Sequence, residues 1–280
     1  MPELPEVETM RRGVAPIVGS RVAGVELPRC PRKPILVAPR LPAMRKRIVG
    51  AEVTGVERLG KRVVVRLSSA LSLVFEPRMT GLVLLAAPPT TEHLRFRLQL
   101  EGGPVDELLY WDRRGLGNVQ LLTAAELAER FADGRLGPDA LALSCEDFRA
   151  RLDSSRRAIK VALLDQRALA GVGNLYASEA LHLARLSPAL ACQELRPADW
   201  RRLHAALREV LETAIKYEGS TLSDGTYRNA LNKAGGYQNH HRVYDRADEA
   251  CLSCGKSAIV RIVQAQRATF FCPRCQRQKR

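Results

Sequence analysis

The sequence lacks any apolar stretch that approaches the roughly 20 consecutive residues needed to cross a bilayer. It also lacks the start of a secretory leader, in which basic residues precede an apolar run, because it begins MPELPEVETMRR. With neither feature present, we expect a cytoplasmic protein without a membrane partner. The opening itself is unusual, since it places two prolines among glutamates directly after the initiator Met1.

Acidic side chains are also in short supply. The chain has 30 Asp and Glu against 44 Lys and Arg, which gives a net charge of +14 and a pI near 9.9. Such an excess indicates a polyanionic partner, and nucleic acid is favoured over a membrane surface because no basic amphipathic anchor stands out. A basic protein without a polyanionic partner is the plainer alternative. The apolar fraction of 46% supports folded cores and excludes a disordered chain.

The spacing of apolar residues changes along the 280 residues, a length that fits two domains or one domain with a module. Residues 5–18 have the pattern of a short helix. From about 20 to 122, short apolar runs alternate with polar residues, which predicts an antiparallel sandwich or barrel of about eight strands. From about 123 the spacing is helical, with Thr123 and Ser144 as candidate N-caps.

The cysteines are unevenly distributed. Cys30, Cys145 and Cys192 stand alone, which fits a reducing compartment. The other four form two Cys-x-x-Cys pairs separated by seventeen residues, the spacing of a four-thiolate zinc ribbon. The sequence therefore predicts one structural Zn²⁺ held by Cys251, Cys254, Cys272 and Cys275. Disulfides or unbound thiols are the alternative. A tail this small cannot build a core, so the metal would supply much of its folding free energy.

A glycine-rich turn lies between two helical segments in RRAIKVALLDQRALAGVGNLYASEAL. Glycines allow a ligand to approach the backbone closely, and the helix that starts at Asn174 would attract anions through its unpaired N–H groups. Lys160 and the pair Arg156 and Arg157 lie just upstream. The turn is therefore a candidate phosphate clamp, with an ordinary packing corner between helices as the alternative.

Taken together, these parts resemble the formamidopyrimidine-DNA glycosylase and endonuclease VIII family of base-excision repair enzymes. The resemblance runs nearly end to end: PELPEVET, RLGKRVVVRL, RMTG, DRRGLG, AIKVALLDQ, GVGNLYASEAL, GSTL, HHRVYDR and QRATFFCPRC. The combination of PELPEVET, GVGNLYASE and two Cys-x-x-Cys pairs is highly specific. The PELPEVE start is typical of the formamidopyrimidine branch, since endonuclease VIII enzymes usually have glycine in place of Leu4.

The resemblance implies an α+β multidomain fold. We expect an N-terminal catalytic β-sandwich domain with a leading helix over residues 1–130 and a linker over 131–145. A helix-two-turn-helix domain carrying the lesion-binding loop would span 146–244, followed by a zinc finger over 245–280. The family binds double-stranded DNA with damaged bases in the cleft between its halves, and we expect a monomer associated with the nucleoid.

The catalytic residues implied by the resemblance begin at Pro2. Methionine aminopeptidase generally removes Met1 before a small residue, and the secondary amine of Pro2 would then attack C1′ of the damaged nucleotide. Glu3 matches the family's proton-transferring carboxylate. Glu6 matches a second buried acid, although a favourable charge in the first turn of a helix explains it equally well. Lys61 matches a cation that contacts the lesion and its phosphate, with a surface lysine as the alternative.

The DNA-binding residues implied by the resemblance fall into two groups. Met79, Arg114 and Leu116 match the side chains that fill the gap left by an everted nucleotide. As isolated residues, Met79 and Leu116 would more often belong to a core. The residues that match the family's other DNA contacts are His93, Lys160, Asn174 and Arg267, of which the last three hold phosphates around the flipped nucleotide.

Several motifs depart from the family pattern. DRRGLG replaces the usual DPRRFG, so Leu116 stands where an aromatic ring is common and Arg113 replaces proline. EPR precedes Met79 in place of HLG, and the lesion-capping loop at 222–242 is divergent. We therefore expect a bifunctional glycosylase and lyase for oxidised purines. A preference for oxidised pyrimidines or abasic sites, a non-catalytic DNA-binding paralogue and an RNA-binding zinc-ribbon protein remain as alternatives.

Overall fold

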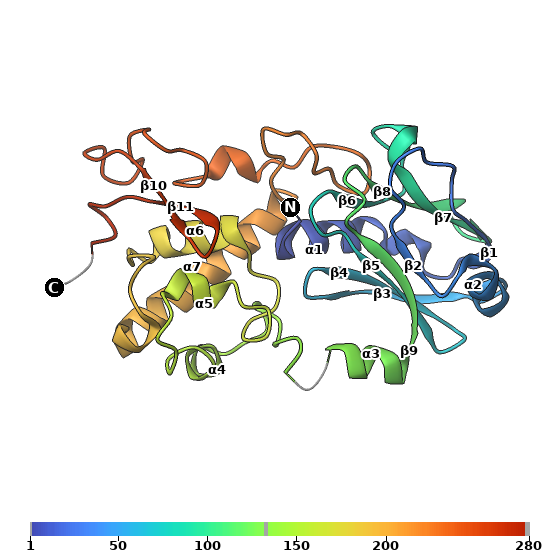
Figure 1. The fold of residues 1–280 in the computed structure, drawn as a ribbon, viewed down its shortest axis with the longest axis horizontal. Coiled ribbons are helices and arrows are strands. Elements are labelled where there is room, and N and C mark those ends of the chain that lie inside the picture. The colour runs from blue at the N-terminus through green and yellow to red at the C-terminus, as the bar shows by residue number, and fades with distance from the viewer. Residues whose placement is uncertain (1, 132–133, 278–280) are drawn as a thin grey trace. The chain divides into compact units, whose positions relative to one another are not determined.

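The computed structural model describes residues 2–131 and 134–277 (Figure 1). The chain divides into two compact units. The first, here called the N-terminal unit, comprises Met1–Asp133 together with Ile215–Gln238. The second, the C-terminal unit, comprises Gly134–Ala214 and Asn239–Arg280.

Two sheets form the frame of the N-terminal unit. One has the strand order β1-β7-β8-β6 and the other β2-β9-β5-β4-β3, and every neighbouring pair is antiparallel except β2 and β9. This confirms the predicted β-rich half. The described strands are β1 (Arg21–Glu26), β2 (Leu36–Ala38), β3 (Val53–Leu59), β4 (Arg62–Leu67), β5 (Leu71–Glu76), β6 (Gly81–Leu84), β7 (Leu94–Glu101), β8 (Glu107–Asp112) and β9 (Asn118–Thr123).

A single apolar core joins the two sheets. Phe75 of β5 and Phe96 of β7 come from different sheets, and their rings meet edge to face with centroids 5.8 Å apart. Both side chains are fully buried, as are Val63 and Val65 of β4. Burial of such side chains stabilises the fold by roughly 1.5–3 kcal/mol each, which explains why alternating apolar residues drive the sheets together.

The leading helix α1 (Leu4–Gly13) packs against β3, β4 and β6. Its apolar side chains Val7 and Met10 belong to the sandwich core. The helix ends earlier than the predicted 5–18, because a 3₁₀ turn (Ala15–Ile17) follows it. At Gly13 a Cβ atom would lie 2.5 Å from Cβ of Ala230, so only glycine fits this contact.

Two further helices lie in this unit. The helix α2 (Leu41–Ile48) falls within the region predicted as strands, and its local signals are Pro42 in the first turn and three basic residues in the last. The helix α3 (Ala124–Phe131) begins after Thr123, whose hydroxyl accepts the N–H of Glu126 at 3.2 Å. The predicted cap at Thr123 is thus confirmed. A 3₁₀ turn covers Thr91–His93.

Residues 215–238 pack with the sandwich although they begin in the last turn of the long helix α7 (Pro197–Lys216), most of which lies in the other unit. The backbone N–H of Ser220 donates to Oε1 of Glu6 at 2.9 Å, and the N–H of Leu85 donates to the carbonyl of Ala230 at 2.8 Å. The predicted 146–244 domain is continuous in sequence, whereas these contacts join part of it to the N-terminal unit.

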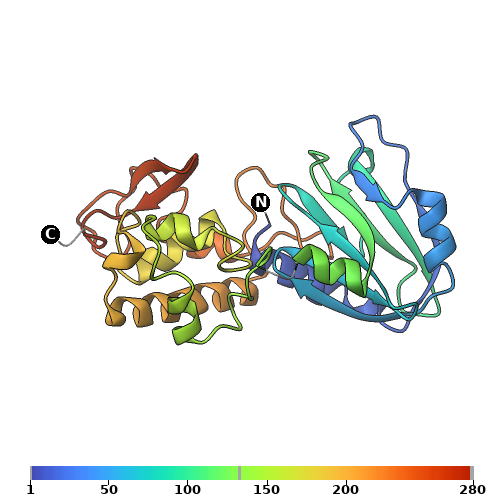
Figure 2. The same ribbon diagram turned by 60° about the horizontal axis from the view of Figure 1, so that its bottom comes forward.

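The C-terminal unit is mainly helical and carries a small hairpin (Figure 2). The side chain of Ser144 accepts the N–H of Asp147 at 3.0 Å, which confirms the predicted cap of α4. The rings of Phe148 and Trp200 meet edge to face in the helical core. The elements are α4 (Cys145–Ala150), α5 (Ile159–Leu163), α6 (Asn174–Leu183), α7 (Pro197–Lys216), two 3₁₀ turns (Cys192–Glu194 and Tyr237–His240), β10 (Val260–Gln264) and β11 (Arg267–Phe271), of which α7 and the second 3₁₀ turn run across the unit boundaries.

None of the helices within residues 2–131 and 134–277 is long and apolar enough to cross a membrane.

Candidate functional site

The first residues of the chain are enclosed in the N-terminal unit. Pro2 is buried, and it lines a small hollow together with Met79, Thr80, Ser220 and Asp224. Met1, which we expect to be removed, lies outside the described residues. Glu3 is also buried, with only 4% of its surface exposed. A proline next to a shielded carboxylate is thus placed at the wall of a hollow, where a substrate atom could approach it.

The buried side chain of Glu6 links the two backbone segments that carry Pro2 and Ser220, both of which line this hollow. Its Oε2 accepts the backbone N–H of Glu3 at 2.9 Å, and its Oε1 accepts the backbone N–H of Ser220 at 2.9 Å. Gly219 adopts a φ of +78°, and a Cβ atom there would lie 2.9 Å from the Glu6 side chain. Glu6 therefore ties the start of α1 to the segment around Ser220, a role that a helix-dipole interaction alone does not require.

Tyr227 forms part of the same wall of the hollow. Its ring is buried, and burial raises the pKa of its hydroxyl well above the ordinary value, with the nearby Glu6 acting in the same direction. The neutral hydroxyl donates to the carbonyl of Glu218. Nothing in the local sequence pattern distinguishes Tyr227 from an ordinary loop aromatic, so its place beside Pro2 became visible only in the structure.

Lys61 and His93 lie at separate places in the N-terminal unit. Lys61 is half-buried in the turn between β3 and β4, after Gly60 with a φ of +57°. His93 is buried, and its ring meets Trp111 edge to face at 5.5 Å. Its Nε2 lies 2.7 Å from Oε1 of Glu92. His93 is thus packed into the fold rather than displayed on its surface.

The three predicted gap-filling side chains all point outward. Met79 and Leu116 are 38% and 46% exposed, and Arg114 is also exposed. Their loops are joined through Asp112 and Thr80, whose side chains hydrogen-bond to each other. The structure therefore displays these apolar side chains to solvent and excludes the alternative that they are core residues.

In the C-terminal unit, Lys160 and Asn174 are direct partners. The Nζ of Lys160 donates to Oδ1 of Asn174 at 2.7 Å, to the carbonyl of Ala268 at 2.9 Å and to the hydroxyl of Thr269 at 2.7 Å. Lys160 is fully buried, whereas Asn174 is half-buried at the first position of α6. The lysine therefore holds the asparagine and the β11 strand together from within the unit.

Arg267 lies at the start of β11 and is exposed. The preceding Ala265 and Gln266 have φ angles of +45° and +61°, which form the tight turn between β10 and β11. The Nδ2 of Asn174 donates to the carbonyl of Ala268 at 2.9 Å, one residue after Arg267. This contact brings the predicted phosphate-binding residues Asn174 and Arg267 to adjoining parts of the C-terminal unit.

Glu179 was not identified from the sequence. Its fully buried carboxylate accepts the backbone N–H groups of Arg242, Val243 and Tyr244 at 2.8–2.9 Å. Burial raises its pKa, and the three N–H donors act in the opposite direction. Through this carboxylate, α6 orders the segment that leads into the metal-binding tail.

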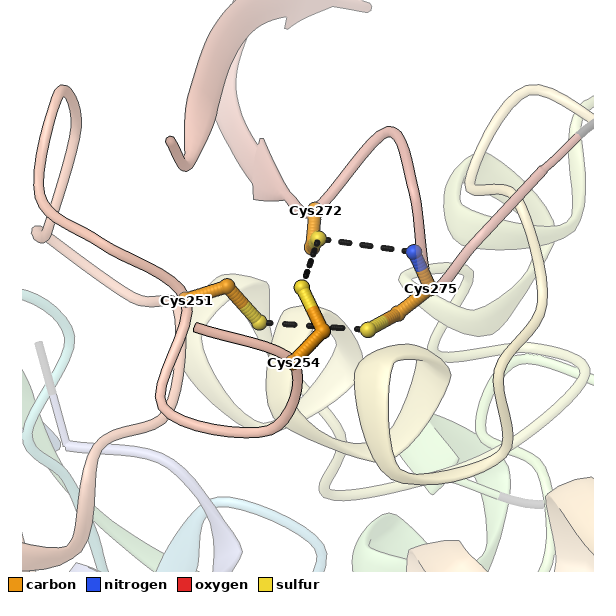
Figure 3. A group of neighbouring side chains, drawn as sticks. All are labelled: Cys251, Cys254, Cys272 and Cys275. Carbon is orange, nitrogen blue, oxygen red and sulfur yellow. Dashed lines mark hydrogen bonds between the residues drawn. The ribbon is translucent and has the colours of Figure 1, made fainter. Parts of the chain in front are cut away.

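The four predicted metal ligands converge (Figure 3). The sulfur atoms of Cys251, Cys254, Cys272 and Cys275 all lie within 4.8 Å of one another. The separations of 3.9 Å for Cys251–Cys275 and 3.8 Å for Cys254–Cys272 are close to the edge of about 3.8 Å of a tetrahedron with metal–sulfur bonds of about 2.3 Å. The geometry and the soft thiolate donors fit a structural metal ion. Nε2 of His182 lies 3.5 Å from the sulfur of Cys251, as an outer contact from α6.

Comparison with known families matches three parts of the chain. The formamidopyrimidine-DNA glycosylase N-terminal domain matches residues 1–119, and the H2TH domain of the same enzymes matches residues 136–226. A zinc finger found in FPG and IleRS matches residues 248–278. The predicted fold class, a β-sandwich followed by a helix-two-turn-helix domain and a zinc finger, is confirmed.

Similar proteins extend over the whole chain. Formamidopyrimidine-DNA glycosylases from Chloroflexus aurantiacus and Thermus thermophilus are each 40% identical, and the alignments cover 99% of this chain and 98% of each relative.

Solved structures show the same likeness. The crystal structure of MutM (FPG) from Thermus thermophilus matches with a TM-score of 0.86 and 38% identity, over 100% of both chains. A complex of a Lactococcus lactis FPG mutant with DNA containing Fapy-dG matches with a TM-score of 0.87 and 32% identity, over 99% of this chain and 100% of that one. The chain, with its outward apolar side chains and four-cysteine cluster, belongs to the formamidopyrimidine-DNA glycosylase family of DNA-repair enzymes.

Proposed function

We propose that the protein removes oxidised purines, such as 8-oxoguanine and formamidopyrimidines, from double-stranded DNA and then cuts the strand at the resulting site. The observation that carries this proposal is the enclosure of Pro2 beside Glu3, in a hollow whose wall includes Met79 and Ser220. The relative from Lactococcus lactis, in complex with DNA containing Fapy-dG, supports the choice of substrate class.

The nucleophile is the nitrogen of Pro2 after removal of Met1. In the unprocessed chain this nitrogen is a tertiary amide, whose lone pair is delocalised into the carbonyl group. Once freed, it is a secondary amine, and α-amino groups titrate near about 7.7–8.0, so a neutral fraction exists at physiological pH. The nitrogen forms a bond to C1′ while the bond from C1′ to the base breaks, and the base leaves with that electron pair and gains a proton.

The nitrogen then loses its proton and opens the sugar ring: the bond from C1′ to O4′ breaks, O4′ gains a proton, and a covalent iminium ion forms. Strand cleavage follows from this ion. Loss of a proton from C2′ expels the 3′ phosphate by β-elimination, and loss of a proton from C4′ expels the 5′ phosphate by δ-elimination. Glu3, buried next to the nucleophile, is the group that accepts and returns protons at the sugar. Glu6 holds the backbone of Glu3 and is therefore assigned a positioning role.

DNA binding is divided between charged and apolar groups. Arg267 and Asn174 hold phosphates, with Lys160 supporting Asn174 from beneath. Lys61 contacts the lesion and its phosphate. Met79 and Leu116 replace the stacking lost when the nucleotide leaves the helix, and Arg114 donates hydrogen bonds to the orphaned base. The position of His93 against Trp111 supports a role in shaping the fold beneath the DNA surface.

The metal of the four-cysteine cluster is proposed to be a single Zn²⁺ ion. Four thiolates in tetrahedral spacing are the usual ligands of structural zinc. When bound, the ion supplies no chemistry at the sugar but stabilises the fold around the hairpin that carries Arg267. We further propose that the protein acts as a monomer in the cytoplasm, where it associates with the nucleoid.

Borohydride trapping tests the enzymatic part of the proposal. Purified protein would be mixed with duplexes that contain 8-oxoguanine, an oxidised pyrimidine or an abasic site, and the iminium would be reduced to a stable adduct. We expect a covalent adduct on the 8-oxoguanine duplex that is lost in Pro2→Gly and in protein that retains Met1. A processed protein that traps on none of the duplexes would overturn the enzymatic proposal and favour a non-catalytic DNA-binding protein.

The same experiment separates the lesion classes. Leu116 in place of an aromatic ring, and Arg113 in place of proline, alter the surface that inspects the lesion pair. Trapping that is strong on the oxidised pyrimidine and weak on 8-oxoguanine would show an endonuclease VIII-like preference. Trapping at the abasic site alone would show a lyase without glycosylase activity on these bases.

A further inference from the structure

We propose that Thr80 and Asp112 form a positioning pair that holds the three gap-filling side chains, Met79, Arg114 and Leu116, in a fixed arrangement. This inference rests on the proposed function, because it assigns the pair to the step in which the damaged nucleotide leaves the helix. Thr80 and Asp112 are buried, whereas Met79 and Leu116 are exposed to solvent. Their role is therefore to orient other groups rather than to touch the reacting atoms.

Asp112 organises the loop that carries Arg114 and Leu116. Its side chain is fully buried at the end of β8. Oδ1 accepts the backbone N–H of Arg114 at 3.1 Å, and Oδ2 accepts the backbone N–H of Gly117 at 2.8 Å. One carboxylate therefore fixes the backbone on both sides of Leu116. Hydrogen bonds to a charged acceptor are roughly twice as strong as those between neutral groups, so this loop is firmly held.

Thr80 connects that loop to the one that carries Met79. Its hydroxyl donates to Oδ1 of Asp112 at 2.5 Å and accepts the backbone N–H of Arg114 at 3.0 Å. The next residue, Gly81, is the direct partner of Asp112 in the antiparallel pair of β6 and β8. Since Met79 immediately precedes Thr80, the hydroxyl of Thr80 links the loop that carries Met79 to the loop that carries Arg114 and Leu116. Thr80 also lines the hollow that contains Pro2.

The residues packed against the loop that carries Arg114 and Leu116 leave it little freedom to shift. A Cβ atom at Gly117 or at Gly81 would collide with the hydroxyl of Tyr110. Gly115 has a φ of +64°, and a Cβ atom there would lie 2.9 Å from the carbonyl of Lys33. From the other side, Nε of Arg95 donates to the main-chain carbonyl of Asp112 at 2.8 Å. The exposed side chains thus stand on a closely packed base.

Ordering of the loop that carries Leu116 before DNA binds has a specific advantage for this chain. The short side chain of Leu116 covers less of an exposed base than an aromatic ring, so its contribution depends more strongly on correct placement. Ordering the loop before DNA binds avoids part of the conformational entropy that binding would otherwise cost. We therefore expect the Thr80–Asp112 pair to affect nucleotide eversion and the reading of the opposite base more strongly than the chemistry at Pro2.

The test compares Thr80→Val, which removes the hydroxyl at nearly constant shape, with Thr80→Ser, which keeps it. Two substrates are used: a duplex with 8-oxoguanine opposite C or A, and a single-stranded oligonucleotide with a preformed abasic site, which needs no gap filling. For Thr80→Val we expect single-turnover excision from the duplex to fall about 10- to 100-fold, in the range seen when a supporting residue misplaces a site. Trapping on the single strand reports the chemistry in the hollow that Thr80 also lines, so it should fall by a clearly smaller factor than excision from the duplex. The ratio of the excision rates opposite C and opposite A should move closer to one.

Several outcomes would overturn the inference. An equal loss on both substrates would show a general structural role, and unchanged excision by Thr80→Val would show no role at all. Failure of Thr80→Ser to restore excision would show that the hydroxyl is not the active feature. Melting temperatures of all variants are measured alongside, so that unfolding is recognised. If the unaltered protein traps on neither substrate, the proposed function fails as well, which distinguishes the two failures.

Discussion

The backbone N–H of Ser220 donates to Oε1 of Glu6 at 2.9 Å, which joins two residues 214 positions apart in the chain. The second oxygen of the same carboxylate accepts the N–H of Glu3. One buried side chain therefore couples the N-terminal segment, where the proposed nucleophile lies, to the loop around Ser220, which also lines the hollow. This relationship explains why a glutamate in the first turn of a helix is buried rather than solvated.

Replacing Glu6 with Gln should weaken this coupling. The amide nitrogen of glutamine is a donor, so one of the two backbone N–H groups would face another donor and lose its acceptor. A buried donor without a partner costs about 1–3 kcal/mol, and we expect a destabilisation of that size in denaturant unfolding. Borohydride trapping should fall as well, because the Glu3 backbone is no longer held. Glu126→Gln is the matched control, since Glu126 makes a similar capping contact with Thr123 but is fully exposed. Equal effects of the two variants would contradict the assigned role of Glu6.

Lys160→Met should reduce DNA affinity without changing its salt dependence. Lys160 has no exposed surface, and its ammonium group donates to Asn174, Ala268 and Thr269. Its loss leaves buried acceptors unsatisfied, so we expect a destabilisation of about 2–4 kcal/mol. Affinity would fall through misplacement of Asn174. Direct loss of a phosphate contact lowers the slope of log affinity against log salt by about 0.9, and we expect this change for the exposed Arg267→Ala instead. A lowered slope for Lys160→Met would show that Lys160 itself reaches a phosphate.

The cysteine cluster should be required for DNA binding but not for folding of the sandwich. Removal of the metal by a chelator would leave four thiols without the ion that holds them together, and Cys254→Ser would remove one ligand. Either change would release the β10–β11 hairpin with Arg267. We expect DNA affinity to be lost, while limited proteolysis leaves the N-terminal unit intact. The control is Cys145→Ser, because Cys145 lies outside the cluster in the same unit. Metal content measured for each protein should be one zinc ion per chain except in Cys254→Ser. Unchanged affinity in metal-free protein would refute this prediction.

The stability of the C-terminal unit should fall in mild acid because of His241. Burial, opposed by a backbone hydrogen bond with Tyr244, lowers the pKa of His241 from 6.5 to about 4. The unfolded chain therefore binds a proton below pH 6.5, whereas the folded chain does so only near pH 4. Stability is complete above pH 6.5 and is lost as the pH falls from there toward 4. Between pH 7.5 and 5.5 the loss should be about 1 kcal/mol.

The measurement compares His241→Gln with His240→Gln at those two pH values. His240 is the adjacent histidine and is exposed, so its replacement controls for the change of residue type. We expect His241→Gln to remove about 1 kcal/mol of the acid-dependent loss, and His240→Gln to leave it in place. Metal content is determined at both pH values, because acid also protonates thiolate ligands. The prediction is wrong if both variants keep the same pH dependence as the unaltered protein.

Local signals in the sequence predicted much of the architecture. Thr123 and Ser144 were identifiable as caps because a side-chain acceptor followed by an acid is a feature of a few consecutive residues. The two Cys-x-x-Cys pairs predicted the metal cluster for the same reason, since each pair makes its own tight turn. The helix α2 was missed because its eight residues are too few to show a helical period among the surrounding strands.

The functional residues divide in a similar way. Family motifs pointed to Pro2, Glu3, Met79, Arg114 and Leu116, and the structure places Pro2 in a buried hollow and the three wedge candidates on the surface. The same motifs suggested a phosphate contact for Lys160, which the structure shows fully buried. Whether a charged side chain reaches solvent or turns inward depends on which neighbours can satisfy it, and those neighbours at 268–269 lie far away in sequence.

The sequence by itself determined the strand and helix periods, the helix caps, the cysteine knuckles and the basic charge, because each depends on neighbouring residues or on composition. Only the tertiary structure decided that residues 215–238 pack with the sandwich and that Glu6 accepts the N–H of Ser220. It also decided that Thr80 and Asp112 link the loop that carries Met79 to the loop that carries Leu116. These pairings depend on which buried donors and acceptors meet once the chain is closed, and a buried polar group must find its partner wherever the fold supplies one. The proposed reacting groups, Pro2 and Glu3, are therefore neighbours in the sequence, but the backbone that holds them is fixed by a contact with a residue more than 200 positions away.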